Sequence, residues 1–160
     1  MPDGQLGKLP LVTPTIQTQL TELGKGEHFD LPPNETLVSL FRQQAAATPD
    51  AIAVVYEDCQ MTYRKLDELT DRLAAHLINN YHIQSEEIVG VMIERSELMV
   101  VYPLSIMKAG AAYMPLDFHF PEERLRYMCQ DAGVRLILSE EDRVGQAMPS
   151  FQGEVFTSYT

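Results

Sequence analysis

The fold of this chain is decided by residues 107–117, which read MKAGAAYMPLD. An apolar helix is predicted to run into Lys108, and Gly110 permits the left-handed turn that ends such a helix. A short strand follows at once, and Pro115 removes a backbone donor, which restricts that strand to a sheet edge or to a strand end. Asp117 comes just past the carboxyl end of the strand. This helix-to-strand connection is typical of a β-α-β unit.

Strands and helices are predicted to alternate on both sides of this stretch. Apolar spacing predicts helices over residues 34–48, 62–80, 96–109 and 121–132. Runs rich in Val and Ile predict strands at 51–56, 59–61, 88–93 and 134–138, with a further strand near 155–156. The order β-α-β-α-β from residue 87 onward predicts an α/β fold. We expect a doubly wound, mostly parallel sheet with helices on both faces, which is a Rossmann-like three-layer unit.

Capping residues and prolines mark where the helices begin. Thr62 and Ser96 are each predicted to cap the helix that follows. A capping box would place Glu or Gln three residues after Thr62, where this chain has Lys65, a cation that opposes the helix dipole. Pro103 falls inside the third helix and is expected to kink it or to lengthen one turn. Pro121 suits the first position of the last helix.

Composition excludes several classes of partner. The chain has 160 residues, 45% of them hydrophobic, which is enough for one domain with a real core. Its formal net charge is −11, from 23 acids and 12 bases, so nucleic acid and anionic membranes are not expected partners. The longest apolar run, residues 98–107, is too short to span a bilayer. Cys59 and Cys129 lack metal-ligand or redox spacing, and no signal peptide precedes them, which predicts a reducing, cytoplasmic location.

Residues 1–33 are predicted to form a connector ahead of a compact part at 34–160. This segment is rich in proline and glycine and has only a weak helical pattern at 16–23. Its Gly24-Lys25-Gly26 sequence does not lie between a strand and a helix, so flexibility explains it better than phosphate binding. A connector of this length suggests that another domain precedes it.

Two short segments lie where α/β sheets bind ligands, beyond the carboxyl ends of strands and near helix N-termini. One is Glu94-Arg95-Ser96 and the other is Asp117-Phe118-His119. Either could contribute to an anion or small-molecule site. The structural alternative is that Ser96 caps a helix, Arg95 pairs with an acid, and Asp117 ties down its loop. No glycine-rich segment accompanies them, which favours the alternative.

The remaining polar residues form no recognisable active site. No Walker loop or G-x-G-x-x-G motif is present, and the four histidines (His28, His76, His82 and His119) lack ligand spacing. Lys108 is expected to stabilise a helix C-terminus, where a cation is favourable, and not to act as a catalytic amine. Tyr63 and Tyr113 are expected to be core aromatics whose hydroxyls need partners.

Several stretches between residues 34 and 144 closely resemble the core motifs of amino-acid adenylation domains from non-ribosomal peptide synthetases. Residues 61–66, MTYRKL, are similar to the family's first motif, L-T/S-Y-x-E-L. Residues 107–117 resemble its second, KAG-x-AY-x-P-L/I-D, and are preceded by the matching VGV and ERS of residues 89–91 and 94–96. The PEERL and DAG of residues 121–125 and 131–133 continue the likeness. Residues 9–13, LPLVT, resemble the linker that joins a condensation domain to an adenylation domain. The departures, Met61, Lys65 and Pro103, are local.

The resemblance implies that residues 34–160 are the first part of an incomplete N-terminal subdomain of the adenylate-forming fold. Residues 1–33 would then be the linker from a condensation domain. It further implies a parent ligase of secondary metabolism that uses ATP and Mg²⁺ to form an aminoacyl adenylate. That parent would pass the acyl group to the phosphopantetheine of a carrier domain. The implied partners are the rest of the adenylation domain, the upstream condensation domain and the downstream carrier domain.

The resemblance also limits what this chain can do alone. In the family, the phosphate loop, the amino-acid pocket and the catalytic lysine lie downstream of these motifs. No catalytic, cofactor-binding or metal-binding residue is therefore assigned here. Structural motif roles are assigned to Tyr63, Gly110, Tyr113, Pro115 and Asp117. We expect an inactive chain that self-associates through apolar surface left exposed by an incomplete sheet.

Two other interpretations remain open at the level of sequence. One is an acyl-CoA or aryl-acid ligase of the same superfamily, although the sequence YMPLD at residues 113–117 favours the amino-acid branch. The other is a non-catalytic interaction module with the same fold. The amino acid selected is not specified by these residues.

Overall fold

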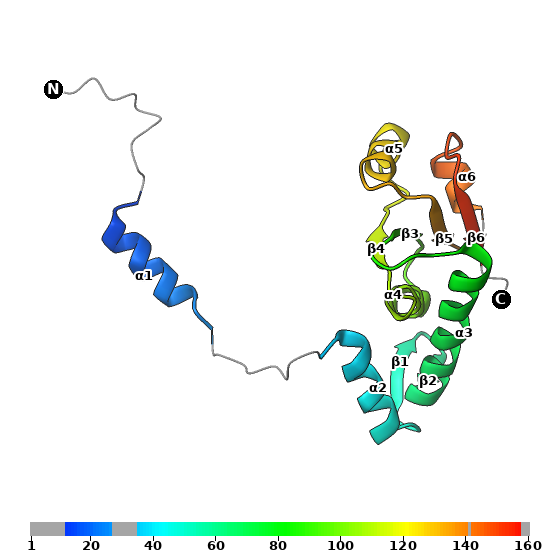
Figure 1. Cartoon of the computed structure of the whole chain (residues 1–160), viewed down its shortest axis with the longest axis horizontal. Helices are drawn as coiled ribbons and strands as arrows, with labels where there is room; N and C mark the ends of the chain where they lie inside the picture. The colour runs from blue at the N-terminus through cyan, green and yellow to red at the C-terminus, as the bar shows by residue number, and fades with distance from the viewer. Residues whose placement is uncertain (1–11, 27–34, 141, 158–160) are drawn as a thin grey trace. The chain divides into compact units, whose positions relative to one another are not determined.

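A computed structural model describes residues 12–26, 35–140 and 142–157 (Figure 1). The chain divides into two compact units, residues 1–35 and 36–160. Predictions for residues 1–11 and 27–34, including His28 and most of the linker-like LPLVT, lie outside the described residues.

The first unit contains one helix, α1 (Pro14–Gly24), in the part that the structure describes. The Thr13 hydroxyl caps it by accepting a hydrogen bond from the backbone N–H of Ile16, and Pro14 occupies the first turn. Lys25 pairs with Glu22 just past its end, at 2.6 Å. The weak helical pattern predicted near residues 16–23 is therefore a helix, and none of its residues is buried.

The second unit is built on a four-stranded parallel sheet. Its strands are β3 (Ile88–Met92), β4 (Ala112–Pro115), β5 (Leu136–Ser139) and β6 (Glu154–Thr157), in the spatial order β4-β3-β5-β6. All three pairings are parallel, which confirms the predicted sheet and its last strand. The strand that ends at Pro115 lies at one edge, as the missing proline donor requires.

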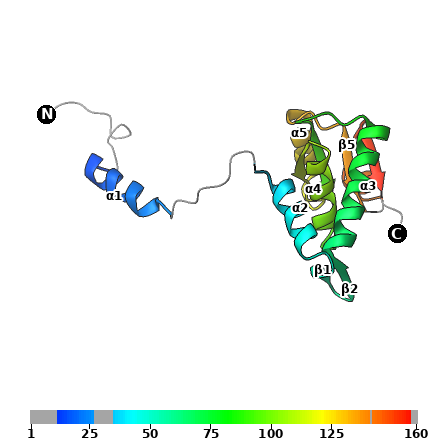
Figure 2. The same cartoon turned by 60° about the horizontal axis from the view of Figure 1, so that its bottom comes forward.

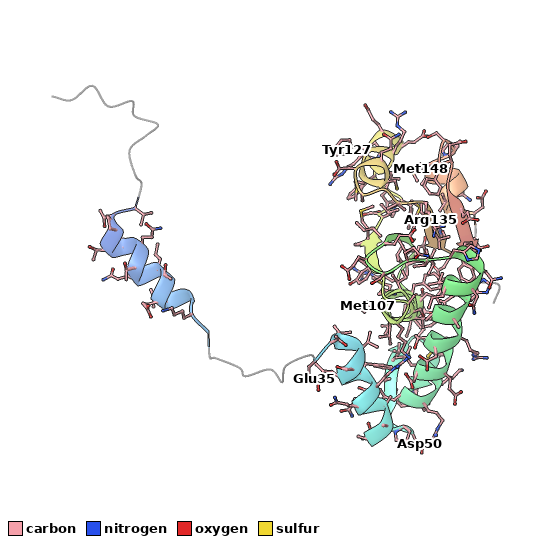
Figure 3. All side chains as sticks on the ribbon, viewed as in Figure 1. Glu35, Asp50, Met107, Tyr127, Arg135 and Met148 are labelled. Carbon is pink, nitrogen blue, oxygen red and sulfur yellow. The ribbon has the colours of Figure 1, made fainter. Side chains whose placement is uncertain are left out.

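Helices cover both faces of this sheet (Figure 1). On one face, α3 (Tyr63–Tyr81) and α4 (Leu98–Lys108) pack side by side, as Figure 2 shows. On the other lie α5 (Glu122–Asp131) and the short α6 (Arg143–Ala147), a helix that the sequence pattern does not predict. In Figure 3, Met107 and Tyr127 mark the α4 and α5 sides. Two buried apolar clusters, one on each face of the sheet, join the helices to the strands, so the three-layer prediction is confirmed.

A helix and a separate hairpin precede the parallel sheet. They are α2 (Leu37–Ala47), β1 (Ile52–Tyr56) and β2 (Cys59–Thr62), and the two strands pair antiparallel. Thr36 and Ser39 form a reciprocal capping box at the start of α2, in which each side chain accepts from the other residue's backbone N–H. The β2 strand then passes directly into α3, where Thr62 accepts from the N–H of Lys65 as predicted.

Helix α4 is apolar around most of its circumference, with the sequence LMVVYPLSIMK. Its buried side chains include Val101, Tyr102, Leu104, Ser105 and Ile106, and Pro103 lies within it. The helix is only 11 residues long. Within the described ranges, the chain has no helix whose length and apolarity would let it cross a membrane.

Several predicted helix boundaries are wrong, and α2, for example, begins at Leu37 and not at residue 34. Helix α3 continues past Asn79-Asn80 to Tyr81 and ends at His82, whose φ of +53° supplies the left-handed residue. Ser96 does not cap α4, which begins after Glu97 without a side-chain cap. Pro121 is the capping residue of α5 and not its first helical residue. By contrast, Gly110 has a φ of +82°, the left-handed conformation predicted for it.

Candidate ligand-binding cleft

The two segments singled out as ligand positions, except for Ser96, line one cleft of about 820 Å³ at the carboxyl ends of β3 and β4. Parallel strands bring these ends to the same edge of the sheet, so segments about twenty residues apart meet there. The lining residues are Tyr56, Val91, Ile93, Glu94, Arg95, Met99, Pro103, Tyr113, Pro115, Leu116, Asp117, Phe118 and His119.

The Asp117 carboxylate organises the loop on the β4 side. It accepts a hydrogen bond from the backbone N–H of His119 at 2.9 Å and contacts the Nδ1 atom of the same residue at 2.9 Å. These hydrogen bonds, the backbone one first, lower the pKa of Asp117. Its carboxylate is therefore committed to its own loop, as the structural alternative predicts.

The β3 side is tied to the loop after β5. The Glu140 carboxylate accepts from the backbone N–H of Glu94 at 3.0 Å and from the Ser96 hydroxyl at 2.9 Å. Arg143 pairs with Glu94 at 2.8 Å, and its guanidinium lies 5.0 Å from the centroid of the Phe118 ring. Ser96 thus holds a neighbouring loop instead of capping a helix, which corrects its predicted role.

Arg95 is the one cation of this segment that remains available to a ligand. Its side chain is exposed, and none of the described acids forms an ion pair with it. The predicted partner acid is therefore not found among the residues that the structure describes. A guanidinium can bind an anionic or aromatic group in two ways, by forked hydrogen bonds or by stacking.

The cleft lining combines apolar side chains with a few polar ones. Among the described residues, its lining contains neither serine, threonine, cysteine nor lysine, and its polar side chains are those of Tyr56, Glu94, Arg95, Tyr113, Asp117 and His119. In the same part of the chain, no group of three or more His, Cys, Asp and Glu side chains is placed to hold a metal ion.

Tyr63 and Lys108 make structural contacts, whereas the prediction for Tyr113 is wrong. Tyr63 is partly buried and packs on Phe41, with ring centroids 6.0 Å apart. Tyr113, predicted to be a core aromatic, is 44% exposed and lines the cleft, because β4 is an edge strand with both faces only lightly covered. Lys108 lies at the end of α4, where its ammonium pairs with Asp67 and Asp71 of α3.

Sequence reasoning did not foresee that the hairpin and α4 contribute to the cleft. Tyr56 comes from the separate hairpin, and Met99 and Pro103 come from α4. Periodicity places a residue on a helix face but does not identify the element that packs against that face. The position of the hairpin beside the cleft could therefore not be predicted. The sequence of α4 did contain a signal for its residues, because it has more apolar side chains than one buried helix face requires.

The sequence profile of the AMP-binding enzymes matches residues 41–157 of this chain. A curated relative, bacitracin synthase 3 of Bacillus licheniformis, is 42% identical over 114 residues, which cover 71% of this chain and 2% of that relative. Tyrocidine synthase 3 of Brevibacillus parabrevis is 39% identical over 140 residues, which cover 88% of this chain and 2% of that relative. The chain thus spans only a small part of the length of the relatives it matches.

Solved structures show the same arrangement of strands and helices. The N-terminal subdomain of Klebsiella oxytoca NpsA, in complex with 3-hydroxyanthranilyl-AMSN, matches with a TM-score of 0.67 and 27% identity. The match covers 76% of this chain and 30% of that one. An artificially fused adenylation–PCP di-domain, NpsA-ThdA, matches with a TM-score of 0.66 and 28% identity over 75% of this chain and 22% of the fusion.

Proposed function

Because this chain belongs to the AMP-binding enzyme family, as an N-terminal part of a non-ribosomal peptide synthetase adenylation domain, we propose that its parent protein activates an amino acid with ATP. The reaction forms an aminoacyl adenylate and releases pyrophosphate. The observation that carries this proposal is the profile match over residues 41–157 together with 42% identity to a peptide synthase. That identity favours the amino-acid branch over the acyl-CoA and aryl-acid ligases.

Within that parent, this chain supplies scaffold and not chemistry. Among the described residues of the cleft, Arg95 is the single cation without an ion pair, and no glycine-rich loop surrounds a triphosphate there. The chain alone is therefore expected to lack adenylation activity, and ATP and Mg²⁺ are bound by residues beyond it.

An ATP–pyrophosphate exchange assay tests both statements. The purified chain, assayed with each common amino acid, should give only background exchange. A complete adenylation domain of bacitracin synthase 3, assayed in parallel, is the positive control. Exchange above background by this chain alone would contradict the scaffold role. The parent's activity is tested by the same assay on the longer polypeptide that contains this chain, where failure with every amino acid would contradict it.

The partners of the parent follow from the same family. We infer a cytoplasmic enzyme whose aminoacyl group passes to the phosphopantetheine thiol of a carrier domain. The match to an artificially fused adenylation–PCP di-domain supports a carrier partner. Residues 1–33 serve as the linker from an upstream condensation domain. The isolated chain is expected to self-associate, because large apolar side chains such as Met99 and Val55 are exposed. Light scattering that shows a monomer at high concentration would contradict that expectation.

A further inference from the structure

A second hollow, separate from the cleft, lies at the amino ends of two strands. It has a volume of about 370 Å³ and lies between α5 and the loop that joins α6 to β6. Gly133 and Val134 border it just before β5, and Gly153 borders it immediately before β6. We call it the amino-end groove; Figure 3 labels Met148, which lines it at the end of α6. Because the cleft lies at carboxyl ends of strands, the two hollows lie at opposite ends of the parallel sheet.

The floor of the amino-end groove is apolar. Cys129, Val134 and Met148 line it and are buried, and the partly buried Phe151 lines it as well. A Cβ at residue 153, a glycine, would lie 2.4 Å from a carbon of the Phe151 ring, so the backbone and the ring are in close contact there. A Cβ at residue 133, also a glycine, would meet no atom within 4 Å, so the groove is open on that side. An apolar group can therefore enter the groove from solvent.

The lining of the groove carries one charge, and that charge is positive. Arg126 is exposed on α5, and none of the described acids forms an ion pair with its guanidinium. Glu122, one helical turn earlier, instead accepts hydrogen bonds from the Ser150 hydroxyl at 2.6 Å and from the Ser150 backbone N–H at 3.3 Å. Among the described residues, the lining includes neither Asp nor Glu, although the chain has 23 acids and 12 bases. The groove thus favours an anion in a protein that is acidic as a whole.

The other polar groups around the groove do not oppose an anion. The side-chain amides of Gln130 and Gln152 line it, and an amide can donate hydrogen bonds without carrying charge. The end of α5 would repel an anion through open carbonyl groups. However, the Val134 N–H donates to the Cys129 carbonyl oxygen at 2.8 Å, and the backbone N–H of residue 133 donates to the Gln130 carbonyl oxygen at 3.3 Å. These carbonyl groups are therefore already hydrogen-bonded.

We propose that the amino-end groove binds small organic anions with an apolar or aromatic body, the anionic group pairing with Arg126 and the body lying on the buried floor. Small-molecule sites combine an apolar lining with a few polar groups that fix orientation, and their volumes begin at about 300 Å³. A guanidinium binds a carboxylate through forked hydrogen bonds. The inference goes beyond the proposed function, because it concerns a further ligand at the other end of the sheet.

Titration of the purified chain with phenylbutyrate tests the proposal, and phenylbutyramide serves as the neutral probe of similar shape. Binding is followed through backbone amide chemical shifts in heteronuclear NMR. Phenylbutyrate should bind saturably with a Kd of about 1 mM or lower, and it should shift the amide signals of residues 129–134 and 148–153. Phenylbutyramide should bind about fivefold more weakly, because it lacks the charge that pairs with Arg126.

Two arginine variants of α5 identify the cation. Arg126→Gln should weaken phenylbutyrate binding about fivefold and leave phenylbutyramide binding unchanged. The matched control is Arg124→Gln, because Arg124 is also exposed on α5 but lies 3.9 Å from the centroid of the Phe120 ring, outside the groove. That variant should keep both affinities within about twofold. Circular dichroism checks that both variants fold.

Three results would overturn the proposal. They are the absence of saturable binding, equal affinity for the acid and the amide, and equal phenylbutyrate affinity in the two variants. Saturable shifts confined to residues 94–119 would also overturn it, because they would place the ligand in the cleft at the carboxyl ends of the strands.

Discussion

Replacing Lys108 by Met should destabilise the second unit substantially, although the position is far from the cleft's loops. The Lys108 ammonium lies 2.5 Å from Asp67 Oδ1 and 2.8 Å from Asp71 Oδ1. It also donates to the Asp67 carbonyl oxygen at 3.0 Å and lies 5.3 Å from the centroid of the Phe41 ring. One side chain thus joins the end of α4 to α3 and α2.

The magnitude follows from the exposure of the partners. A hydrogen bond to a charged group contributes about 1.5–3 kcal/mol, and Lys108→Met removes three of them. The Asp67 and Asp71 side chains are 32% and 47% exposed, so water replaces much of what they lose. Met keeps most of the aliphatic packing. We expect a net loss of about 2 kcal/mol in the free energy of unfolding, or about 8 °C in Tm for a unit of this size.

Thermal unfolding followed by circular dichroism measures this loss. The matched control is Lys65→Met, because Lys65 is an exposed lysine of α3 with no ion-pair partner among the described residues. That variant should change Tm by less than about 2 °C, since surface substitutions usually stay within ±0.5 kcal/mol. Equal Tm values for the two variants would refute the reasoning, because burial and three polar contacts would then have no energetic effect.

Three further outcomes are expected. Partial burial disfavours the charged form of Asp71, but hydrogen bonds from Lys108 and Arg42 outweigh it and lower its pKa below the ordinary 3.8. The stability advantage of wild type over Asp71→Asn in urea unfolding should therefore be present at pH 6 and shrink as the pH falls below about 4; a constant difference would contradict it. Gly110→Ala should cost about 1–2 kcal/mol, because the φ of +82° is strained for any residue with a Cβ, and unchanged urea unfolding would count against this. Cys129 is buried, which raises the pKa of its thiol, so iodoacetamide should modify the partly exposed Cys59 at least tenfold faster, and equal rates in mass spectrometry would disagree with that burial.

Local signals in the sequence were sufficient for most of the architecture. The unbroken apolar run at residues 88–93 predicted a parallel strand covered on both faces, and the structure places β3 in the sheet interior. Pro115 predicted an edge position for its strand, because a missing donor is tolerated there. The amino-acid sequence of the motif at residues 107–117 was sufficient to indicate the family, and the profile match confirms that family.

Boundaries and roles that depend on distant partners were less predictable. Serine is a common helix-capping residue, but the Ser96 hydroxyl instead donates a hydrogen bond to the carboxylate of Glu140, 44 residues later. His82 ends α3 in a left-handed conformation, and the Arg135 guanidinium donates to its carbonyl oxygen and to that of Tyr81 from the start of β5. Such contacts join segments about 50 residues apart, so no local pattern reveals them.

The sequence by itself determined that this chain is a parallel α/β unit of the adenylation family, because periodicity, punctuation by Gly and Pro, and the core motif are local properties. Only the tertiary structure decided that the two segments predicted as ligand positions share one cleft with the hairpin's Tyr56. It also decided that Tyr113 faces outward and that one side of α4 remains uncovered. The physical reason is that exposure depends on which elements pack against a face, and that packing is set by contacts between residues far apart in the chain.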